Sequence, residues 1–385
     1  MLKWELVHRV YLLFAMLVIA ICGCVAMLLN DSDTTGGGIV FLLTYVVLLP
    51  GIIPYLKTRT EQRPPSVIIW LNVLLLWMLL ISLLIVRTNL YTLIFLCLNI
   101  LITQAALCAA YGYSVRYGFS KSIIFGAVLM QLILSVQYGH IYQIANEASD
   151  AHLITAYYPM FLLPLVLTYP SKTIRYASIL LVTIIIFSSV KRGGLIALGA
   201  GLFVYILCTS HIRQRGMKAI LFTVFGLSLV GTIFYAIGSS EYGTVIERFT
   251  SIQSDEGSGR LDVWGTTWYM IQHSDGIAYL VGHGINAVLR DSPLYLSAHN
   301  DFLEAWYDYG VIGFILYIIS LVSLSRYTLH LLRKKSPVAP SMAMLVTIML
   351  ILTMISHVLI YYFMTLCCLT IGLLAGADTY NEHHE

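Results

Sequence analysis

Long apolar runs separated by short polar breaks make up most of this chain. Each run has a length, about 17 to 25 residues, that crosses about 30 Å of hydrocarbon as a helix. The pattern predicts an all-α, polytopic integral membrane protein with about twelve transmembrane helices. We expect these helices at roughly 10–29, 39–56, 66–86, 90–110, 122–138, 153–168, 176–190, 195–209, 219–237 and 309–325, with two more in 338–376 divided near His357.

The composition excludes an ordinary soluble protein. Mean hydropathy is +0.84, and 59% of the residues are hydrophobic while only 11% are charged. A soluble domain carries about 25% charged residues. The seven cysteines all lie within apolar runs, so we expect them to pack against other apolar side chains rather than to form disulfides or a zinc site. The start of the chain shows no distinct cleavage pattern, and its first run is interpreted as a transmembrane helix.

The placement of Lys and Arg orients the chain in the membrane. With the N-terminus in the cytoplasm, sixteen of the 22 Lys and Arg residues fall on the cytoplasmic side, as the positive-inside rule requires. One long polar segment, 238–308, then lies outside. The chain is thereby divided into transmembrane helices 1–9 in 1–237, a large helical periplasmic loop in 238–308, and helices 10–12 with a short cytoplasmic tail in 309–385.

Lys191 and Arg192 depart from the charge rule, because they lie at the outer end of a helical hairpin. Gly193 and Gly194 follow them and would let two backbones approach closely. Ionisable groups between apolar helices usually face a cavity or a partner. Two interpretations are open: a pair whose charged ends reach the interface, or an anion site, for which the planar guanidinium of Arg192 suits a phosphate.

The outer segment holds the remaining candidate chemistry. Leu261, Trp264 and Trp268 recur at helical spacing and predict an amphipathic surface helix, with Arg260 in its first turn. Arg260 is then either an anion ligand or an ordinary surface arginine. His299 stands at the start of a helix that continues into the tenth span, where it is either a general base or a capping or surface residue. The glycines of Gly282-His283-Gly284 indicate a tight backbone turn.

No metal or cofactor is expected. The sequence has no HExxH, no DxD, no Cys/His pair at ligand spacing and no phosphate-binding glycine loop. An outer active site has no ATP, so bond energy must come from an activated donor. Arginines that hold a diphosphate, together with a histidine that deprotonates a hydroxyl, would suit transfer from a lipid-linked sugar, with charge on the leaving diphosphate stabilised by the arginines.

These motifs, in this order, resemble the O-antigen polymerase and O-antigen ligase superfamily of bacterial surface-polysaccharide assembly. The resemblance covers about 190–315. The features that carry it are the Lys191-Arg192-Gly193-Gly194 hairpin, Ser258-Gly259-Arg260 followed by Trp264, then Gly282 and Gly284, His299-Asn300, and Gly310 with Gly313.

The resemblance implies a metal-independent, inverting glycosyltransferase of the GT-C type in the bacterial inner membrane, with its active site facing the periplasm. Arg192 and Arg260 would bind the diphosphate of an undecaprenyl-diphosphate-linked glycan, and His299 would activate the acceptor. Arg290 would be a third phosphate ligand or a surface residue. A separate chain-length regulator is the expected protein partner, alongside membrane lipid, and no nucleic acid is expected.

Polymerase and ligase differ in the acceptor, which is another lipid-linked repeat unit or lipid A-core. Only fourteen residues separate Gly284 from His299, and no added segment suits a large lipid A-core, which favours the polymerase of lipopolysaccharide biosynthesis. A transporter of lipid-linked sugars is a further alternative. It is disfavoured because no internal repeat is apparent and the spans carry few charges. A non-catalytic scaffold is the last alternative.

Overall fold

The computed structural model describes residues 2–28, 34–61, 63–85, 90–148, 153–189, 191–212, 259–359 and 362–384. Within these ranges the regular structure is helical throughout. The helices of the bundle are α1 (Leu2–Leu28), α2 (Thr34–Glu61), α3 (Ser66–Leu84), α4 (Leu90–Tyr117), α5 (Lys121–Ala148), the 3-10 turn η1 (Leu153–Ala156), α6 (Tyr157–Val166), α7 (Lys172–Ser188), α8 (Arg192–Ile212), α14 (Asp301–Arg333), α15 (Ala339–Ile355) and α16 (Tyr362–His384). Three shorter helices precede α14: α11 (Arg260–Gln272), α12 (Gly276–Val281) and α13 (Ala287–Asp291).

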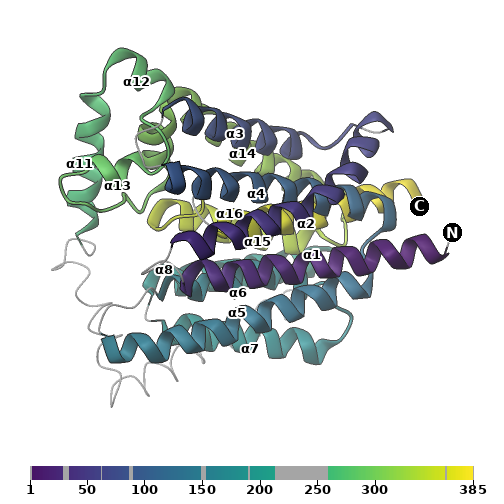
Figure 1. The fold of residues 1–385 in the computed structure, drawn as a ribbon. Coiled ribbons are helices and arrows are strands. Elements are labelled where there is room, and N and C mark those ends of the chain that lie inside the picture. Colours follow the sequence, from purple (N-terminus) through teal and green to yellow (C-terminus); the bar gives the residue numbers. More distant parts are fainter. Residues whose placement is uncertain are drawn as a thin grey trace.

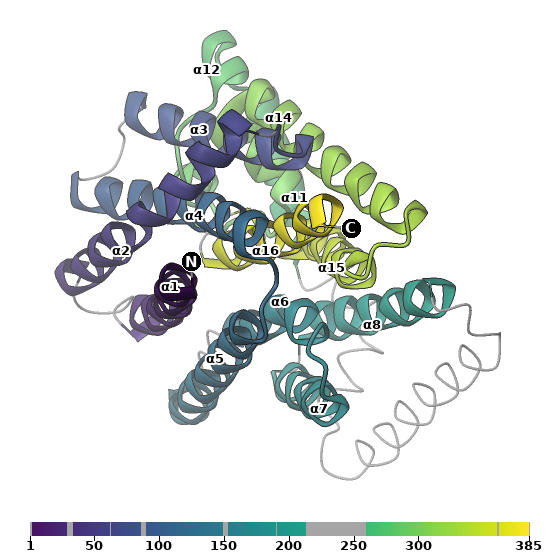
Figure 2. The same cartoon turned by 90° about the vertical axis from the view of Figure 1, so that its right-hand side faces the viewer.

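The helices of the bundle run side by side, with both chain ends at one end of the bundle and α11, α12 and α13 at the other (Figure 1). Viewed from the end that carries the termini, α16 and α6 lie in the middle of the bundle (Figure 2). Every residue of α6 is buried, as is α16 from Tyr362 to Thr379. The helices in the described part of the polar outer segment, α11, α12 and α13, are therefore collected at one end of an apolar bundle.

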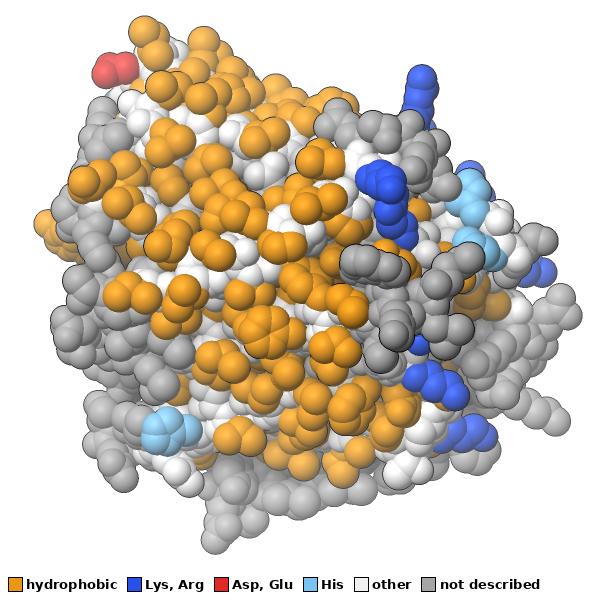
Figure 3. Space-filling view, turned by 45° about the vertical axis from the view of Figure 1, so that its right-hand side comes forward, with side chains coloured by type: hydrophobic (Ala, Val, Ile, Leu, Met, Phe, Trp, Pro, Cys, Tyr) orange, Lys and Arg blue, Asp and Glu red, His pale blue; other side chains and the backbone are white. Residues whose placement is uncertain are grey.

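The surface of the bundle supports a membrane location. Hydrophobic side chains cover the middle of the face shown in Figure 3, and Lys and Arg side chains gather toward the right of that view. Seven of the described helices are long and apolar enough to cross a membrane, and α1, α6 and α15 contain shorter apolar stretches. The chain is thus a polytopic, all-helical membrane protein, and the count of twelve spans stays a prediction. The predicted ninth span, 219–237, and the part of the outer segment at 238–258 lie outside the described residues.

Small residues bring the central helices together. A Cβ at Gly372 would lie 2.8 Å from the carbonyl oxygen of Leu107, and one at Gly376 would lie 2.7 Å from that of Tyr111. Two glycines four apart on α16 thus let its backbone contact α4. Apolar lipid offers helices no hydrophobic drive to associate, so close van der Waals packing of this kind holds membrane helices together.

Several helices extend beyond the apolar runs that predicted them. The predicted basic loop at 111–121 is helical as far as Tyr117, and the predicted polar loop at 140–152 is helical as far as Ala148. The sequence analysis predicted that these helices end where the apolar run ends, at about 110 and 138. This was wrong, because the polar residues there continue the helix into the interface with their backbone hydrogen bonds made.

Glycine contacts fix the outer helices on α14. Gly310 interrupts the helical conformation of α14 with φ 70° and ψ −177°. At this point the amide of Gly284 donates to the carbonyl of Asp308 (2.9 Å), and that of His283 donates to Tyr307 (3.0 Å). A Cβ at Gly282 would lie 2.2 Å from the Asp308 carbonyl oxygen. The predicted backbone role of the Gly282–Gly284 turn is confirmed: two chain segments cross here at a distance that a side chain would prevent.

Candidate functional site

His299 lies at the N-terminal end of α14. The side-chain oxygen of the next residue, Asn300, accepts hydrogen bonds from the amides of Phe302 (3.0 Å) and Leu303 (3.3 Å). Asn300 is therefore the N-cap, and His299 is free of the capping role that was one of its two interpretations. His299 has φ 51°, a left-handed conformation that costs a non-glycine residue about 1 to 3 kcal/mol and is concentrated at functional sites.

A hydrogen bond joins α11 to the residue before His299. The indole nitrogen Nε1 of Trp264 donates to the carbonyl of Ala298 at 2.8 Å. Arg260 lies four residues before Trp264 on the same face of α11 and is the first residue of that helix. Although 39 positions separate Arg260 from His299, the Trp264 contact brings the start of α11 to the start of α14.

The start of α8 packs against the end of α15, which leads into the link that carries His357. A Cβ at Gly193 would lie 2.5 Å from Cδ1 of Ile355, and one at Gly194 would lie 2.6 Å from Cε1 of Tyr157. The predicted close approach of two backbones at these glycines is wrong, because the near neighbours of both are side chains, from Ile355, Tyr157 and Ile186. Lys191 and Arg192, both partly buried, immediately precede these glycines.

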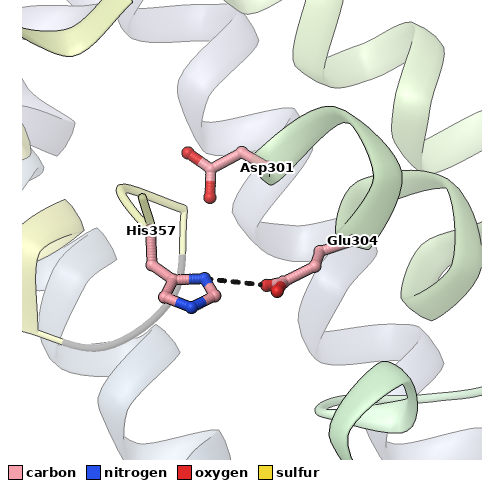
Figure 4. Close-up of side chains that lie close together, drawn as sticks. All are labelled: Asp301, Glu304 and His357. Carbon is pink, nitrogen blue, oxygen red and sulfur yellow. Dashed lines mark hydrogen bonds and ion pairs between the residues drawn. The ribbon is translucent and has the colours of Figure 1, made fainter. Parts of the chain in front are cut away.

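A second histidine, His357, completes this end of the bundle. It lies in the link between α15 and α16, and its ring centroid is 4.4 Å from that of His299, with the planes at 44°. Its Nδ1 is 3.1 Å from Oε2 of Glu304 on α14, and both side chains are buried. Figure 4 shows the ring of His357 turned toward the Glu304 carboxylate.

The electrostatics show which charges meet at His299. Burial lowers the pKa of its imidazole, and the charge of His357 adds to the effect. Arg260 and Lys191 contribute further, so that the pKa falls from 6.5 to about 3. Three positive groups therefore act on one ring: Arg260 from α11, Lys191 next to α8, and His357 from the α15–α16 link. Lys191, from the basic pair, is one of the charges that act on the ring.

Asp301 holds the backbone of the link. Its carboxylate accepts hydrogen bonds from the amides of Val358 (2.9 and 3.1 Å) and Leu359 (3.2 Å), and from the hydroxyls of Thr353 (2.7 Å) and Tyr317 (3.1 Å). These contacts attach the α15–α16 link, which carries His357, to Asp301 in the first turn of α14. Asp301 is fully buried, and its oxygens are committed to this turn.

Asp301, Glu304 and His357 are also the group whose ligand atoms could hold a metal ion, since those atoms lie within 4.8 Å of one another (Figure 4). Their spacing of three and 53 residues matches no linear signature, which is why the sequence search for metal ligands passed them over. The oxygens of Asp301 accept hydrogen bonds from Val358, Leu359, Thr353 and Tyr317. Within the group itself, Nδ1 of His357 bonds to Oε2 of Glu304, and the buried Oε1 of Glu304 has no hydrogen-bond partner among the described residues.

Arg290 is engaged elsewhere. Its Nε and Nη2 donate to the two carboxylate oxygens of Asp291 at 2.8 and 2.9 Å, and Nη2 also donates to the carbonyl of His283 at 3.2 Å. It thereby joins α13 to the Gly282–Gly284 turn. The structure brings Lys191, Arg260 and His299 together with His357, whereas it gives Arg290 a local ion pair.

Sequence reasoning missed His357 and Glu304 as members of the site. The available signal was a histidine that divides the last apolar stretch at a turn which, by the charge count, faces outward. Glu304 gave a weaker signal, as an acidic residue in the first turn of a predicted helix.

Comparison with known proteins gives one family match. The family model described as O-antigen ligase matches residues 177–318, from α7 into α14. The matched part includes Lys191, Arg192, Arg260, Arg290 and His299, and His357 lies beyond it. No curated protein matches the chain. The match bears out the resemblance to the O-antigen ligase and polymerase superfamily, whose members act on lipid-linked polysaccharides.

Proposed function

We propose that this chain, whose residues 177–318 match the O-antigen ligase family, is a surface-polysaccharide polymerase of the bacterial inner membrane. It transfers an undecaprenyl-diphosphate-linked glycan to a hydroxyl of another lipid-linked repeat unit at the periplasmic face. One observation supports the proposal: the charges of Lys191 and Arg260, from the start of α8 and of α11, both act on His299 at the start of α14.

The cations supply the site for the donor. An approaching diphosphate would meet the ammonium of Lys191 and the guanidinium of Arg260, with Arg192 beside them. The N-terminal ends of α8 and α11 add the favourable end of the helix dipole. Negative charge grows on the bridging oxygen as the glycosidic bond breaks. These groups therefore stabilise the transition state more than the bound donor, which is what accelerates a reaction.

His299 is the proton acceptor. Burial and the charges of His357, Arg260 and Lys191 lower its pKa to about 3, so the ring is neutral at physiological pH and can accept a proton. A donor diphosphate beside Arg260 and Lys191 would offset their charges and raise the basicity of the ring, since a nearby negative charge favours the protonated form. The base would thus strengthen once the donor is bound.

The reaction is a single displacement. The acceptor hydroxyl oxygen attacks the anomeric carbon, and its proton passes to His299. The bond between that carbon and the diphosphate oxygen breaks, with its electron pair leaving on undecaprenyl diphosphate. Attack opposite the leaving group inverts the configuration. The protonated histidine then returns its proton to solvent.

The second candidate is a ligase that transfers the glycan to lipid A-core. The description of the matching family favours it. The compact segment between Gly284 and His299, occupied largely by the short helix α13, favours the polymerase, because it adds no surface for a large core oligosaccharide. Both candidates use the same donor and the same chemistry.

Complementation of a strain that lacks this gene tests the proposal. Wild type, Arg192→Ala, Arg260→Ala and His299→Ala are compared by the polysaccharide ladder on a gel, with His273→Ala as the matched control, since His273 is exposed at the end of α11. A polymerase deletion leaves single repeat units on lipid A-core, and a ligase deletion leaves bare core while long lipid-linked chains accumulate. Full ladders from well-expressed Arg260→Ala and His299→Ala would refute the site.

A further inference from the structure

The short helix α12 exposes its apolar side chains. None of its six residues is buried, and none is charged. Ile277 is 79% exposed, Leu280 52% and Tyr279 37%. Each Å² of apolar surface that stays in water forgoes about 25 cal/mol of stabilisation. A contiguous group of such side chains therefore marks a surface that an apolar partner covers.

The position of α12 brings these side chains to the depth at which α14 enters the hydrocarbon. Figure 2 shows α12 at the rim of the bundle, beyond α3 and α14, and Figure 1 shows it on the same flank. The backbone of Leu280 packs directly on Gly310 of α14, where a Cβ would overlap the Leu280 carbonyl. Ile312 and Ile315, which are 38% and 48% exposed, follow Gly310 within about 8 Å of helix rise. Both lie in the apolar stretch of α14 that is long enough to cross a membrane.

A cluster of aromatic rings marks the same depth. The ring of Trp306 on α14 lies 5.9 Å from that of Tyr279 on α12 and 5.5 Å from that of Trp268 on α11. It also stacks on Phe314, at 4.8 Å between centroids, in the part of α14 that carries the exposed isoleucines. Trp and Tyr are enriched where a membrane protein meets the headgroup region, because each has an apolar body and a polar tip. The cluster therefore joins α11, α12 and α14 at the level of the membrane interface.

The apolar surface of α12 is matched to phospholipid rather than to a protein. It continues the lipid-facing side of α14 past Ile312, so a bilayer that surrounds α14 also reaches α12. A protein interface carries a rim of charged and hydrogen-bonding groups around its apolar centre, whereas the polar side chain of α12 is the Tyr279 hydroxyl alone.

We propose that α12 inserts into the phospholipid leaflet at the outer end of the bundle, with Ile277 and Leu280 among the upper acyl carbons and Tyr279 at the headgroups. Elements of this kind bury their apolar face about 5 to 10 Å into the boundary between headgroups and acyl chains. The segment 238–308, expected to lie wholly outside the membrane, then contains a helix within it. Through the aromatic cluster, α12 also holds α11 at the membrane surface. The inference goes beyond the proposed function and does not depend on it.

Photo-crosslinking of the full-length protein in lipid vesicles tests the insertion. Benzoylphenylalanine is placed at position 277 or 280, and the protein is reconstituted into vesicles of palmitoyl-oleoyl phosphatidylethanolamine and phosphatidylglycerol. Position 312, on the exposed face of α14, is the lipid-facing reference. Position 262 is the matched control in water, because Asp262 is an exposed carboxylate on α11 of the same outer segment.

Lipid adducts formed on irradiation are measured by mass spectrometry of the intact protein. We expect the yields at 277 and 280 to match the yield at 312, and the adduct to be lost at 262. Adducts between two copies of the chain, in place of lipid adducts, would overturn the proposal and make α12 a protein interface. The absence of any adduct at both positions would overturn it in favour of a surface in water.

A second measurement keeps every native side chain. Protein with ¹³C-labelled isoleucine methyl groups is studied by NMR in nanodiscs, and the Ile277 resonance is the one lost in the conservative variant Ile277→Val. A nitroxide on the upper acyl chain of the lipid should broaden this resonance more strongly than a water-soluble gadolinium chelate does. The reverse order would overturn the proposal even if benzoylphenylalanine disturbs the fold. Neither measurement uses glycan transfer, so its outcome is separate from that of the proposed function.

Discussion

Charged side chains cluster at both ends of this bundle, and the two clusters are built in opposite ways. At the end that carries the termini, Lys334 forms ion pairs with Asp378 and Glu382, and Asp378 also accepts from Ser336 at 2.6 Å and Tyr327 at 3.2 Å. At the outer end, Lys191, Arg260 and His357 direct positive charge at one histidine. Opposite charges pair with each other in the first cluster, whereas in the second several positive groups act on one ring and Glu304 pairs with His357.

The difference separates structure from function. A neutralised cluster lowers the energy of the folded chain by itself. Positive groups gathered around one ring raise the energy of its protonated form, and ionisable groups perturbed in this way are concentrated at functional sites. The outer cluster is therefore the one to test for activity and the inner cluster the one to test for stability. The experiments that follow exploit this contrast.

The largest effect is expected from His299→Gln. Loss of a general base reduces transfer by about 10²- to 10⁴-fold, measured as the initial rate of polysaccharide formation by purified protein. The control is His273→Gln at the same end, where the ring stacks on Tyr269 with 3.9 Å between centroids and is exposed. Equal losses in the two variants would show that any histidine change at this end disturbs the protein.

Arg260→Ala should reduce the rate by about 10²- to 10³-fold, because it removes one charged donor to the leaving diphosphate. Arg260→Lys should recover part of the loss, since it keeps the charge and loses the planar fork. The matched control is Arg333→Ala, an exposed arginine at the inner end of α14. If Arg333→Ala lowered the rate as much, the contrast between the two ends would fail.

Asp378→Asn should affect stability and leave the rate per folded molecule unchanged. The carboxylate is buried and bonds to Lys334, Ser336 and Tyr327. Breaking its hydrogen bonds to a charged partner costs about 1 to 3 kcal/mol, visible as a lower apparent Tm in nanodiscs. A variant with normal Tm and reduced transfer would assign function to the inner cluster instead.

Stability at low pH should depend on His299. Its pKa is about 3 in the folded chain and about 6.5 in the unfolded one, so the unfolded chain binds more protons between these values. Stability therefore rises with pH across this window and falls as the pH drops below about 6.5. The apparent Tm of His299→Gln should fall less than that of wild type between about pH 7 and pH 5. Parallel curves would contradict the lowered pKa.

The smallest effect is expected from chelation. Transfer should continue unchanged in EDTA, because the proposed steps use only protein cations and a histidine. A loss of activity that added divalent metal restores would show instead that Asp301, Glu304 and His357 hold an ion. The same measurement on Glu304→Gln would then locate that ion.

Local pattern accounts for most of the helices. Apolar runs located each described span, and the turn near His357 was found because a polar residue interrupts 338–376. The helix ends were less accurate, as at Tyr117 and Ala148, because hydrophobicity marks where a helix meets lipid and not where its hydrogen bonds stop. The sequence predicted that Gly282 and Gly284 form a tight backbone turn. It did not predict that this turn packs against the backbone of Asp308.

The sequence by itself determined that this is a polytopic helical membrane protein, and it predicted one polar segment outside, with Arg192, Arg260 and His299 as candidate catalytic residues and Lys191 and Arg290 as further candidate ligands. The free energy of transfer into lipid acts residue by residue, so it can be read along the chain. Only the tertiary structure decided that the beginnings of α8, α11 and α14 lie near the α15–α16 link. It also decided that Arg290 forms an ion pair with Asp291. The contact of His357 with both His299 and Glu304 likewise came from the structure alone. Those contacts join residues far apart in sequence, and their pairing depends on how whole helices pack.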